Sequence, residues 1–175
     1  VGEMRDIETA QIGIQASLTG HLVLSTVHTN SAVAAITRLR DMGIESFLLA
    51  SSLRTIISQR LVRRLCLNCR YDDETTNDIA KLFKLNIGQK IYKSKGCDKC
   101  SYTGYQGRIA IAECIQVDER LKEMIHNNSS ETEISNYVFK DNQSIDKASQ
   151  DLLINGITSA DELIRVGNLK EDAEL

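Results

Sequence analysis

The chain has 175 residues, of which 42% are hydrophobic and 26% are charged, and its formal net charge is −3. This composition argues against wholesale disorder, and the length suits one domain or one and a fraction. No apolar run approaches the roughly 20 residues of a membrane span, and no secretory signal opens the chain. Because the sequence starts in mid-motif at Val1, we expect it to be part of a longer protein.

The first 65 residues alternate between short apolar runs and helical patterns, which is typical of an α/β fold. We interpret Val1-Gly2 as the end of a buried strand that stops at Glu3, and His21–Val27 as a central parallel strand. Asn30 or Ser31 is suited to cap the second helix. The expected helices cover residues 7–18, 32–42 and 46–59, and a strand is expected over residues 61–65.

The remaining elements follow from the same patterns. A strand is expected over Arg108–Val117, and the charged tail Lys170–Leu175 is expected to be frayed. The helix over residues 46–59 is expected to bury Phe47, Leu49 or Ala50, Leu53 and Ile57. Short helices are expected over residues 118–127, 131–140, 144–154 and 158–166, capped by Asp118, Ser130, Ser144 and Thr158.

Four of the five cysteines form two Cys-x-x-Cys pairs, Cys66/Cys69 and Cys97/Cys100, with 27 residues between the pairs. Two such pairs supply the four thiolates that tetrahedral Zn²⁺ prefers, and each pair is too tight for a comfortable disulfide framework. A closed shell of four thiolates leaves no position for substrate, so we expect a structural zinc, with reduced thiols or a redox pair as the alternatives. The fifth cysteine, Cys114, is expected in the core because its neighbours are apolar.

Basic residues are distributed unevenly along the chain. Residues 1–70 hold eight arginines and five acids, whereas residues 71–175 hold 13 basic and 19 acidic residues. Between Arg54 and Arg70, both included, there are five arginines and no acid. This arginine stripe suits the phosphates of a nucleic acid or nucleotide, but a solvated helix face or a subunit contact is the alternative. The negative net charge of the whole chain argues against nucleic acid as a partner.

Glu3 and His28 are the candidate catalytic and phosphate-contacting residues, and His21 lies at the start of the expected strand that ends before His28. Ligands of parallel sheets bind beyond the carboxyl ends of the strands, where a carboxylate can orient an attacking water and a histidine can donate to a terminal phosphate. Glu3 and His28 lie at such ends, whereas His21 lies at the opposite end of its strand and is suited to bracing the sheet. The alternatives are a helix-dipole interaction for Glu3 and ordinary core hydrogen bonds for the histidines.

Several stretches together resemble the secretion ATPase superfamily. Residues 1–10 read Val-Gly-Glu-Met-Arg-Asp-Ile-Glu-Thr-Ala, and residues 18–30 read Leu-Thr-Gly-His-Leu-Val-Leu-Ser-Thr-Val-His-Thr-Asn. These stretches are similar to the end of the Walker B segment and to the histidine box of that superfamily. The match continues through residues 37–44, 59–61, 104–108 and 156–159 and the two cysteine pairs. The type II secretion assembly ATPases are the most similar group, followed by the type IV pilus extension ATPases, whereas the pilus retraction ATPases lack the four cysteines.

The resemblance implies a fold and a domain organisation. Residues 1–65 would be the C-terminal half of a RecA-like P-loop NTPase core, and residues 66–104 an inserted tetracysteine zinc lobe. Residues 105–175 would be a strand and a C-terminal helical region. It also implies a homo-hexameric motor at the cytoplasmic face of the bacterial inner membrane, where ATP hydrolysis drives an inner-membrane platform and cytoplasmic-domain proteins of the secretion system.

The resemblance also assigns roles to individual residues. Glu3 corresponds to the catalytic Walker B glutamate, which acts with Mg²⁺ on the attacking water. His28 corresponds to the histidine near the γ-phosphate of ATP, and His21 to its partner. The four paired cysteines, Cys66, Cys69, Cys97 and Cys100, correspond to the zinc ligands.

One expected element is absent from the sequence. The chain contains no Gly-x-x-x-x-Gly-Lys-[Ser/Thr] loop and no Gly-Lys dipeptide, although that loop holds the β- and γ-phosphates in P-loop enzymes. We therefore expect an enzyme only when the upstream half is present. The alternative is a non-catalytic, zinc-stapled coupling module that transmits force or docks a partner.

Overall fold

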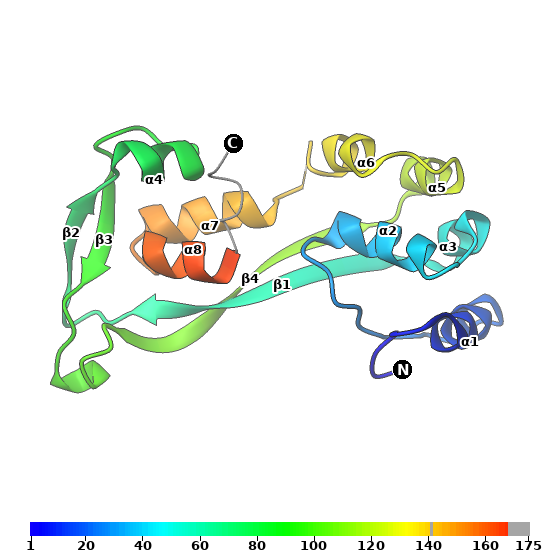
Figure 1. Ribbon diagram of the computed structural model, residues 1–175, viewed down its shortest axis with the longest axis horizontal. Coiled ribbons are helices and arrows are strands. Elements are labelled where there is room, and N and C mark those ends of the chain that lie inside the picture. Colours follow the sequence, from blue (N-terminus) through cyan, green and yellow to red (C-terminus); the bar gives the residue numbers. More distant parts are fainter. Residues whose placement is uncertain (141, 168–175) are drawn as a thin grey trace. The chain divides into compact units, whose positions relative to one another are not determined.

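The computed structural model describes residues 1–140 and 142–167, so the expected tail at Lys170–Leu175 lies outside the described residues. The chain divides into two compact units (Figure 1). Unit 1 comprises residues 1–58 and 113–143, and unit 2 comprises residues 59–112 and 144–175. The α/β fold class predicted from the sequence is confirmed.

The core of unit 1 is built from short amphipathic helices. Buried apolar side chains, among them Ile36, Leu49 and Ile125, form one continuous cluster. Its helices are α1 (Ile7–Leu18), α2 (Ala32–Asp41), α3 (Ser46–Ser52), α5 (Glu119–His126) and α6 (Glu131–Val138). No helix in the described part of the chain is both long and apolar enough to cross a membrane.

Side-chain caps begin these helices where the sequence predicts them. Ser31 accepts a hydrogen bond from Ala34 N at the start of α2, and Asp118 accepts one from Leu121 N at the start of α5. Ser130 forms a capping box with Glu133 at the start of α6. Gly43 follows α2 with a φ of 91°, a conformation that favours glycine after a helix end.

The helix expected over residues 46–59 is wrong beyond Ser52. Strand β1 (Thr55–Leu65) pairs with strand β4 (Tyr105–Gln116) instead, and the main chain of Val117 donates a hydrogen bond to Arg54 O at 2.9 Å. Pairing with β4 therefore determines the secondary structure of this segment and overrides the helical spacing of its apolar residues. Leu49 and Ala50 are buried as expected, whereas Phe47 and Ile57 are 50% and 64% exposed, contrary to expectation.

The central parallel strand expected at His21–Val27 is also wrong for the described residues. This segment is extended and lies beside residues 1–4, but only two backbone hydrogen bonds join them, from the Val1 ammonium to Leu24 O and from Met4 N to Thr26 O. Leu22 and Leu24 are 87% and 74% exposed, so the segment has an open face instead of a buried central position.

Unit 2 contains a hairpin-like lobe and two helices. Strands β2 (Arg70–Glu74) and β3 (Lys90–Ser94) pair antiparallel, with Arg70 opposite Ser94, and helix α4 (Asn77–Leu82) connects them (Figure 1). A short 3₁₀ helix, η1, covers Asp98–Cys100, and helices α7 (Ile145–Ile154) and α8 (Ala160–Gly167) complete the unit. Its core includes Val62, Phe83, Ile91, Ile111, Leu153 and Leu163.

Helix α8 begins at a different residue from the one expected. Ser159 Oγ accepts the hydrogen bond from Glu162 N at 3.2 Å, whereas the predicted cap, Thr158, donates its hydroxyl to Arg63 O at 2.8 Å. The long-range contact with β1 therefore takes Thr158, and the next hydroxyl caps the helix.

A buried carboxylate joins α8 to β1. The Glu162 side chain has no exposed surface, and it accepts hydrogen bonds from Arg63 and Arg165 at distances of 2.7–2.9 Å. Arg63 also stacks over the Tyr105 ring, 4.0 Å from its centroid. Burial by itself raises the pKa of Glu162, but the hydrogen bonds from Arg165 and Arg63 outweigh it and lower the pKa from 4.5 to about 2.

This network predicts an acid-sensitive stability. Because the carboxyl pKa is lower in the folded state, the unfolded chain binds the proton first, and Glu162 stabilises the fold fully above pH 4.5 and progressively less down to about pH 2. Glu162→Gln is expected to remove this pH dependence and to lower the free energy of unfolding at pH 7 by about 3 kcal/mol. Denaturant unfolding followed by circular dichroism at several pH values measures both effects.

The exposed i,i+3 pair of Arg120 and Glu123 supplies the control. Glu123→Gln is expected to change the free energy of unfolding by no more than about 0.5 kcal/mol and to keep the acid dependence. Equal effects of Glu162→Gln and Glu123→Gln would contradict the role given to the buried carboxylate.

Candidate functional site

The structure brings Glu3 and His28 together in unit 1. His28 Nε2 lies 3.1 Å from Glu3 Oε1, and the Glu3 side chain is 21% exposed whereas that of His28 is 91% exposed. The two residues come from segments that are 25 positions apart in the sequence, and the main-chain bond from Met4 to Thr26 aligns these segments. An acid and an imidazole therefore share one edge of the unit, with the imidazole facing solvent.

Arg5 is a further member of this group. Its guanidinium lies 2.5 Å from Glu3 Oε2, and this hydrogen bond, opposed by some desolvation, lowers the pKa of Glu3 below 4.5. The Glu3 carboxyl is ionised at neutral pH even at its ordinary pKa, and the lowered pKa makes it a weaker base, which suits a group that orients a water or a cation better than one that removes protons. Arg5 was not predicted from the sequence as a site residue, although side chains two positions apart on an extended segment lie on the same side.

His21 does not join this group. Its Nδ1 atom lies 3.2 Å from Ala16 O and 3.2 Å from Thr19 Oγ1, at the C-terminal end of α1. His28 is seven positions further along the extended segment, where it contacts Glu3. The structure therefore places the two histidines at opposite ends of the segment, as their sequence spacing indicates.

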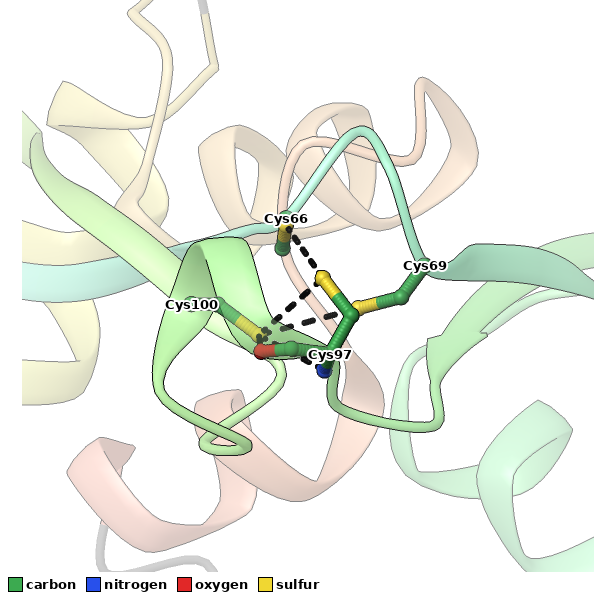
Figure 2. A group of neighbouring side chains, drawn as sticks. All are labelled: Cys66, Cys69, Cys97 and Cys100. Atoms are coloured by element: carbon green, nitrogen blue, oxygen red, sulfur yellow. Dashed lines mark hydrogen bonds between the residues drawn. The ribbon is translucent and has the colours of Figure 1, made fainter.

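The four paired cysteines form a compact cluster in unit 2 (Figure 2). Cys66 and Cys69 lie in the turn between β1 and β2, and Cys97 and Cys100 lie in the turn between β3 and β4. All four sulfur atoms lie within 4.8 Å of one another. These residues could therefore hold a metal ion such as zinc.

The spacing of the sulfur atoms fits a tetrahedral metal site. The separations are 3.9 Å between Cys66 and Cys97, 3.8 Å between Cys69 and Cys100, and 3.7 Å between Cys97 and Cys100. Four sulfurs at about 2.3 Å from one Zn²⁺ in tetrahedral geometry lie about 3.8 Å apart. A disulfide needs about 2.05 Å, and all four cysteines are free thiols in this structure.

Backbone N–H groups also point at one of the sulfurs. Burial raises the pKa of the Cys100 thiol, but hydrogen bonds from the main-chain N–H groups of Cys97 and Gly104, at 3.2 and 3.3 Å, outweigh it and lower the pKa to about 6. For Cys69, burial dominates and raises the pKa to about 12. Backbone N–H groups that hydrogen-bond a thiolate sulfur in this way stabilise its charge and hold it in position as a metal ligand.

Cys114 lies apart from this cluster, and its expected core position is wrong. The side chain is exposed because residues of β4 alternate between the two faces, and the buried face carries Ile111, Glu113 and Ile115. Apolar neighbours in the sequence did not reveal which face the cysteine occupies.

Three arginines of the stripe make contacts within unit 2. Besides the contact of Arg63 with Glu162, Arg60 donates to Val166 O at 3.2 Å and Arg70 donates to Gly156 O at 2.8 Å. These side chains tie β1 and the first cysteine turn to the C-terminal helices. These three arginines do not form the solvated helix face given as an alternative, because Arg60 and Arg63 lie on β1, Arg70 begins β2, and all three make contacts within the unit.

The comparisons with known proteins decide the family. The family model described as "Type II/IV secretion system protein" matches residues 1–165. The chain belongs to this family. The resemblance predicted from the sequence is confirmed.

Curated relatives in this family share nearly half of their aligned residues with the chain. The type II secretion system protein E of Klebsiella pneumoniae is 48% identical over 95% of this chain and 33% of its own length. The type II secretion system ATPase E of Vibrio cholerae is 48% identical over 95% of this chain and 33% of its own length. The chain therefore spans about a third of the length of these relatives.

Solved structures with the same fold include an ATPase and a pilus retraction motor. The Legionella pneumophila ATPase DotB superposes with a TM-score of 0.61 at 21% identity, over 97% of this chain and 37% of DotB. The pilus retraction motor PilT superposes with a TM-score of 0.63 at 22% identity, over 99% of this chain and 39% of PilT. At this level of identity the likeness shows the fold alone.

The cysteine geometry predicts metal-dependent folding of the lobe. The purified chain is expected to contain about one zinc ion, and Cys100→Ser is expected to release it because one of four thiolates is lost. Elemental analysis measures the zinc content, and thermal unfolding with and without a chelator measures the stability. When the chelator removes the metal, residues 66–100 are expected to unfold before the rest of the chain. Cys114→Ser is the matched control and should keep both metal and stability, while zinc retained by Cys100→Ser would contradict the site.

Proposed function

We propose that this chain is the C-terminal portion of a hexameric motor ATPase that couples ATP hydrolysis to protein secretion by a type II secretion system. Family membership over residues 1–165 and the name of the Vibrio cholerae relative, a type II secretion system ATPase, support the activity. The observation that carries the proposal is the contact of Glu3 with His28 at 3.1 Å, because it joins the two residues to which the family resemblance gives hydrolytic roles.

Glu3 is proposed as the catalytic carboxylate. Mg²⁺ bound with ATP supplies charge stabilisation for the phosphoryl group. Glu3, whose carboxylate accepts a hydrogen bond from Arg5, orients the attacking water through its carboxylate oxygens. The exposed imidazole of His28 donates a hydrogen bond to the terminal phosphate.

His21 is proposed to act on nucleotide binding only indirectly. Its contacts with Ala16 and Thr19 attach the start of the extended segment to the end of α1. This contact sets where the segment begins, and so contributes to the position that His28 takes at the other end.

A zinc ion held by Cys66, Cys69, Cys97 and Cys100 is proposed to have a structural role. The two cysteine turns flank the β2–α4–β3 lobe, so one ion would fix both ends of that lobe. The proposed domain division has three parts. Residues 1–65 are the C-terminal half of the ATPase core, residues 66–104 are the zinc lobe, and residues 105–175 are a strand and the C-terminal helical region.

The partners and location follow from the proposed machine. The full-length protein would assemble as a homo-hexamer at the cytoplasmic face of the bacterial inner membrane and act on an inner-membrane platform and cytoplasmic-domain proteins. A role in pilus extension is the alternative. The two curated relatives described above are named for type II secretion, which favours the secretion role. A non-catalytic, zinc-stapled coupling module is the alternative of a different class.

The catalytic role of Glu3 predicts a large loss of hydrolysis in the full-length protein. Glu3→Gln keeps the size of the side chain but removes its charge, so the ATP hydrolysis rate is expected to fall by about 10²–10⁴-fold. Phosphate release at saturating ATP measures the rate. Glu8→Gln, in the first turn of α1, is the matched control and should be close to wild type, whereas unchanged hydrolysis in Glu3→Gln would favour the coupling module.

The 175-residue chain by itself is expected to hydrolyse ATP negligibly, because it contains no loop to hold the β- and γ-phosphates. The same phosphate-release assay on the purified chain tests this expectation. Activity that Glu3→Gln abolishes would show that the missing loop is dispensable.

A further inference from the structure

Glu113 is an acidic residue on the buried face of strand β4. Its exposure is only 4%, and its neighbours on that face, Ile111 and Ile115, are apolar. A buried carboxylate is costly unless hydrogen bonds compensate for the lost water. Glu113 Oε1 accepts a hydrogen bond from the backbone N–H of Ala32 at 2.7 Å, across 81 positions of sequence and within unit 1.

The partner of this carboxylate is the first residue of α2. The first N–H groups of a helix have no acceptor within the helix, and a negative charge beside them is favourable. At the start of α2, Ser31 Oγ takes the N–H of Ala34 and Glu113 takes the N–H of Ala32. Since Ala32 is itself 1% exposed, the two acceptors fix the start of α2 against β4.

The start of α2 lies four residues after His28. Thr29 Oγ1 donates to Ser31 O at 3.0 Å, which closes the turn between His28 and the helix. On the other side of His28, Thr26 O accepts from Met4 N at 2.9 Å, and Thr26 Oγ1 donates to Gly2 O at 2.9 Å. The segment that carries His28 is therefore held at both ends, by residues 2–4 on one side and by Glu113 on the other.

We propose that Glu113 is a positioning residue for ATP hydrolysis, which anchors the start of α2 and thereby holds His28 in contact with Glu3. The inference rests on the proposed function, because it gives Glu113 a task only if Glu3 and His28 act on the nucleotide. Glu113 acts through the Ala32 N–H and the turn at residues 29–31, and its substitution is expected to change the rate of the bound complex more than the affinity for ATP.

The test uses three variants of the full-length protein. Glu113→Ala removes the acceptor, whereas Glu113→Gln keeps a side-chain oxygen that can accept from Ala32. Asp118→Ala is the matched control, because it removes a cap of α5 in the same unit and its side chain accepts hydrogen bonds from Leu121 N and the Tyr137 hydroxyl, not from α2. The measurements are kcat and KM for ATP, thermal stability, and hydrogen–deuterium exchange of peptides that cover residues 27–34.

Glu113→Ala is expected to increase exchange in residues 27–34 and to lower kcat by about ten- to a hundredfold, with little change in KM. Glu113→Gln is expected to restore most of both. Asp118→Ala is expected to lower thermal stability while keeping kcat. An unchanged kcat in Glu113→Ala, or an equal loss in Asp118→Ala, would overturn the positioning role.

Failure of the proposed function would look different. In that case Glu3→Gln would leave hydrolysis intact. Hydrogen–deuterium exchange of residues 27–34 would still test, independently of activity, whether Glu113 anchors the start of α2. Unchanged exchange of residues 27–34 in Glu113→Ala would overturn the anchor whatever the activity.

Discussion

The lateral hydrogen bonding between residues 1–4 and residues 24–26 is the interaction on which the proposed site depends. The bond from Met4 N to Thr26 O sets the register of the two segments, and this register brings Glu3 close to His28, two positions after Thr26. A shift by one residue would turn the side chains to opposite faces. Residues 2–4 hold the second segment on one side of His28, and the bond of Glu113 to Ala32 fixes the start of α2 on the other.

Unit 2 is organised around charged and sulfur groups as much as around its apolar core. Glu162 joins two arginines to α8, and the four cysteines gather two turns that are separated by 27 residues in the sequence. The buried Glu162 carboxylate needs its two arginines, and a metal site of four thiolates needs all four cysteines. The stability of unit 2 is therefore sensitive to the loss of one member of either group. This explains why the arginine stripe, which suggested phosphate binding, has largely internal partners.

Helix positions were predictable because their signals are local. The caps at Ser31, Asp118 and Ser130 and the helix end at Gly43 each follow from residues within one turn of the chain. The errors occurred where a segment is bonded to a partner distant in sequence. Pairing with β4 makes the residues after Arg54 a strand, and the hydroxyl of Thr158 donates to Arg63 O instead of capping α8. Nothing in the local sequence reports such partners.

The sequence by itself determined the family resemblance, the cysteine pairs and the candidate residues Glu3, His21 and His28, because those signals are residue types at fixed spacings. Only the tertiary structure showed that Arg5 pairs with Glu3 and lowers its pKa, that Cys114 faces outward, and that Glu113 bonds to α2. These features depend on which face of an extended segment meets a neighbour distant in sequence, and that choice is made by packing of the whole unit.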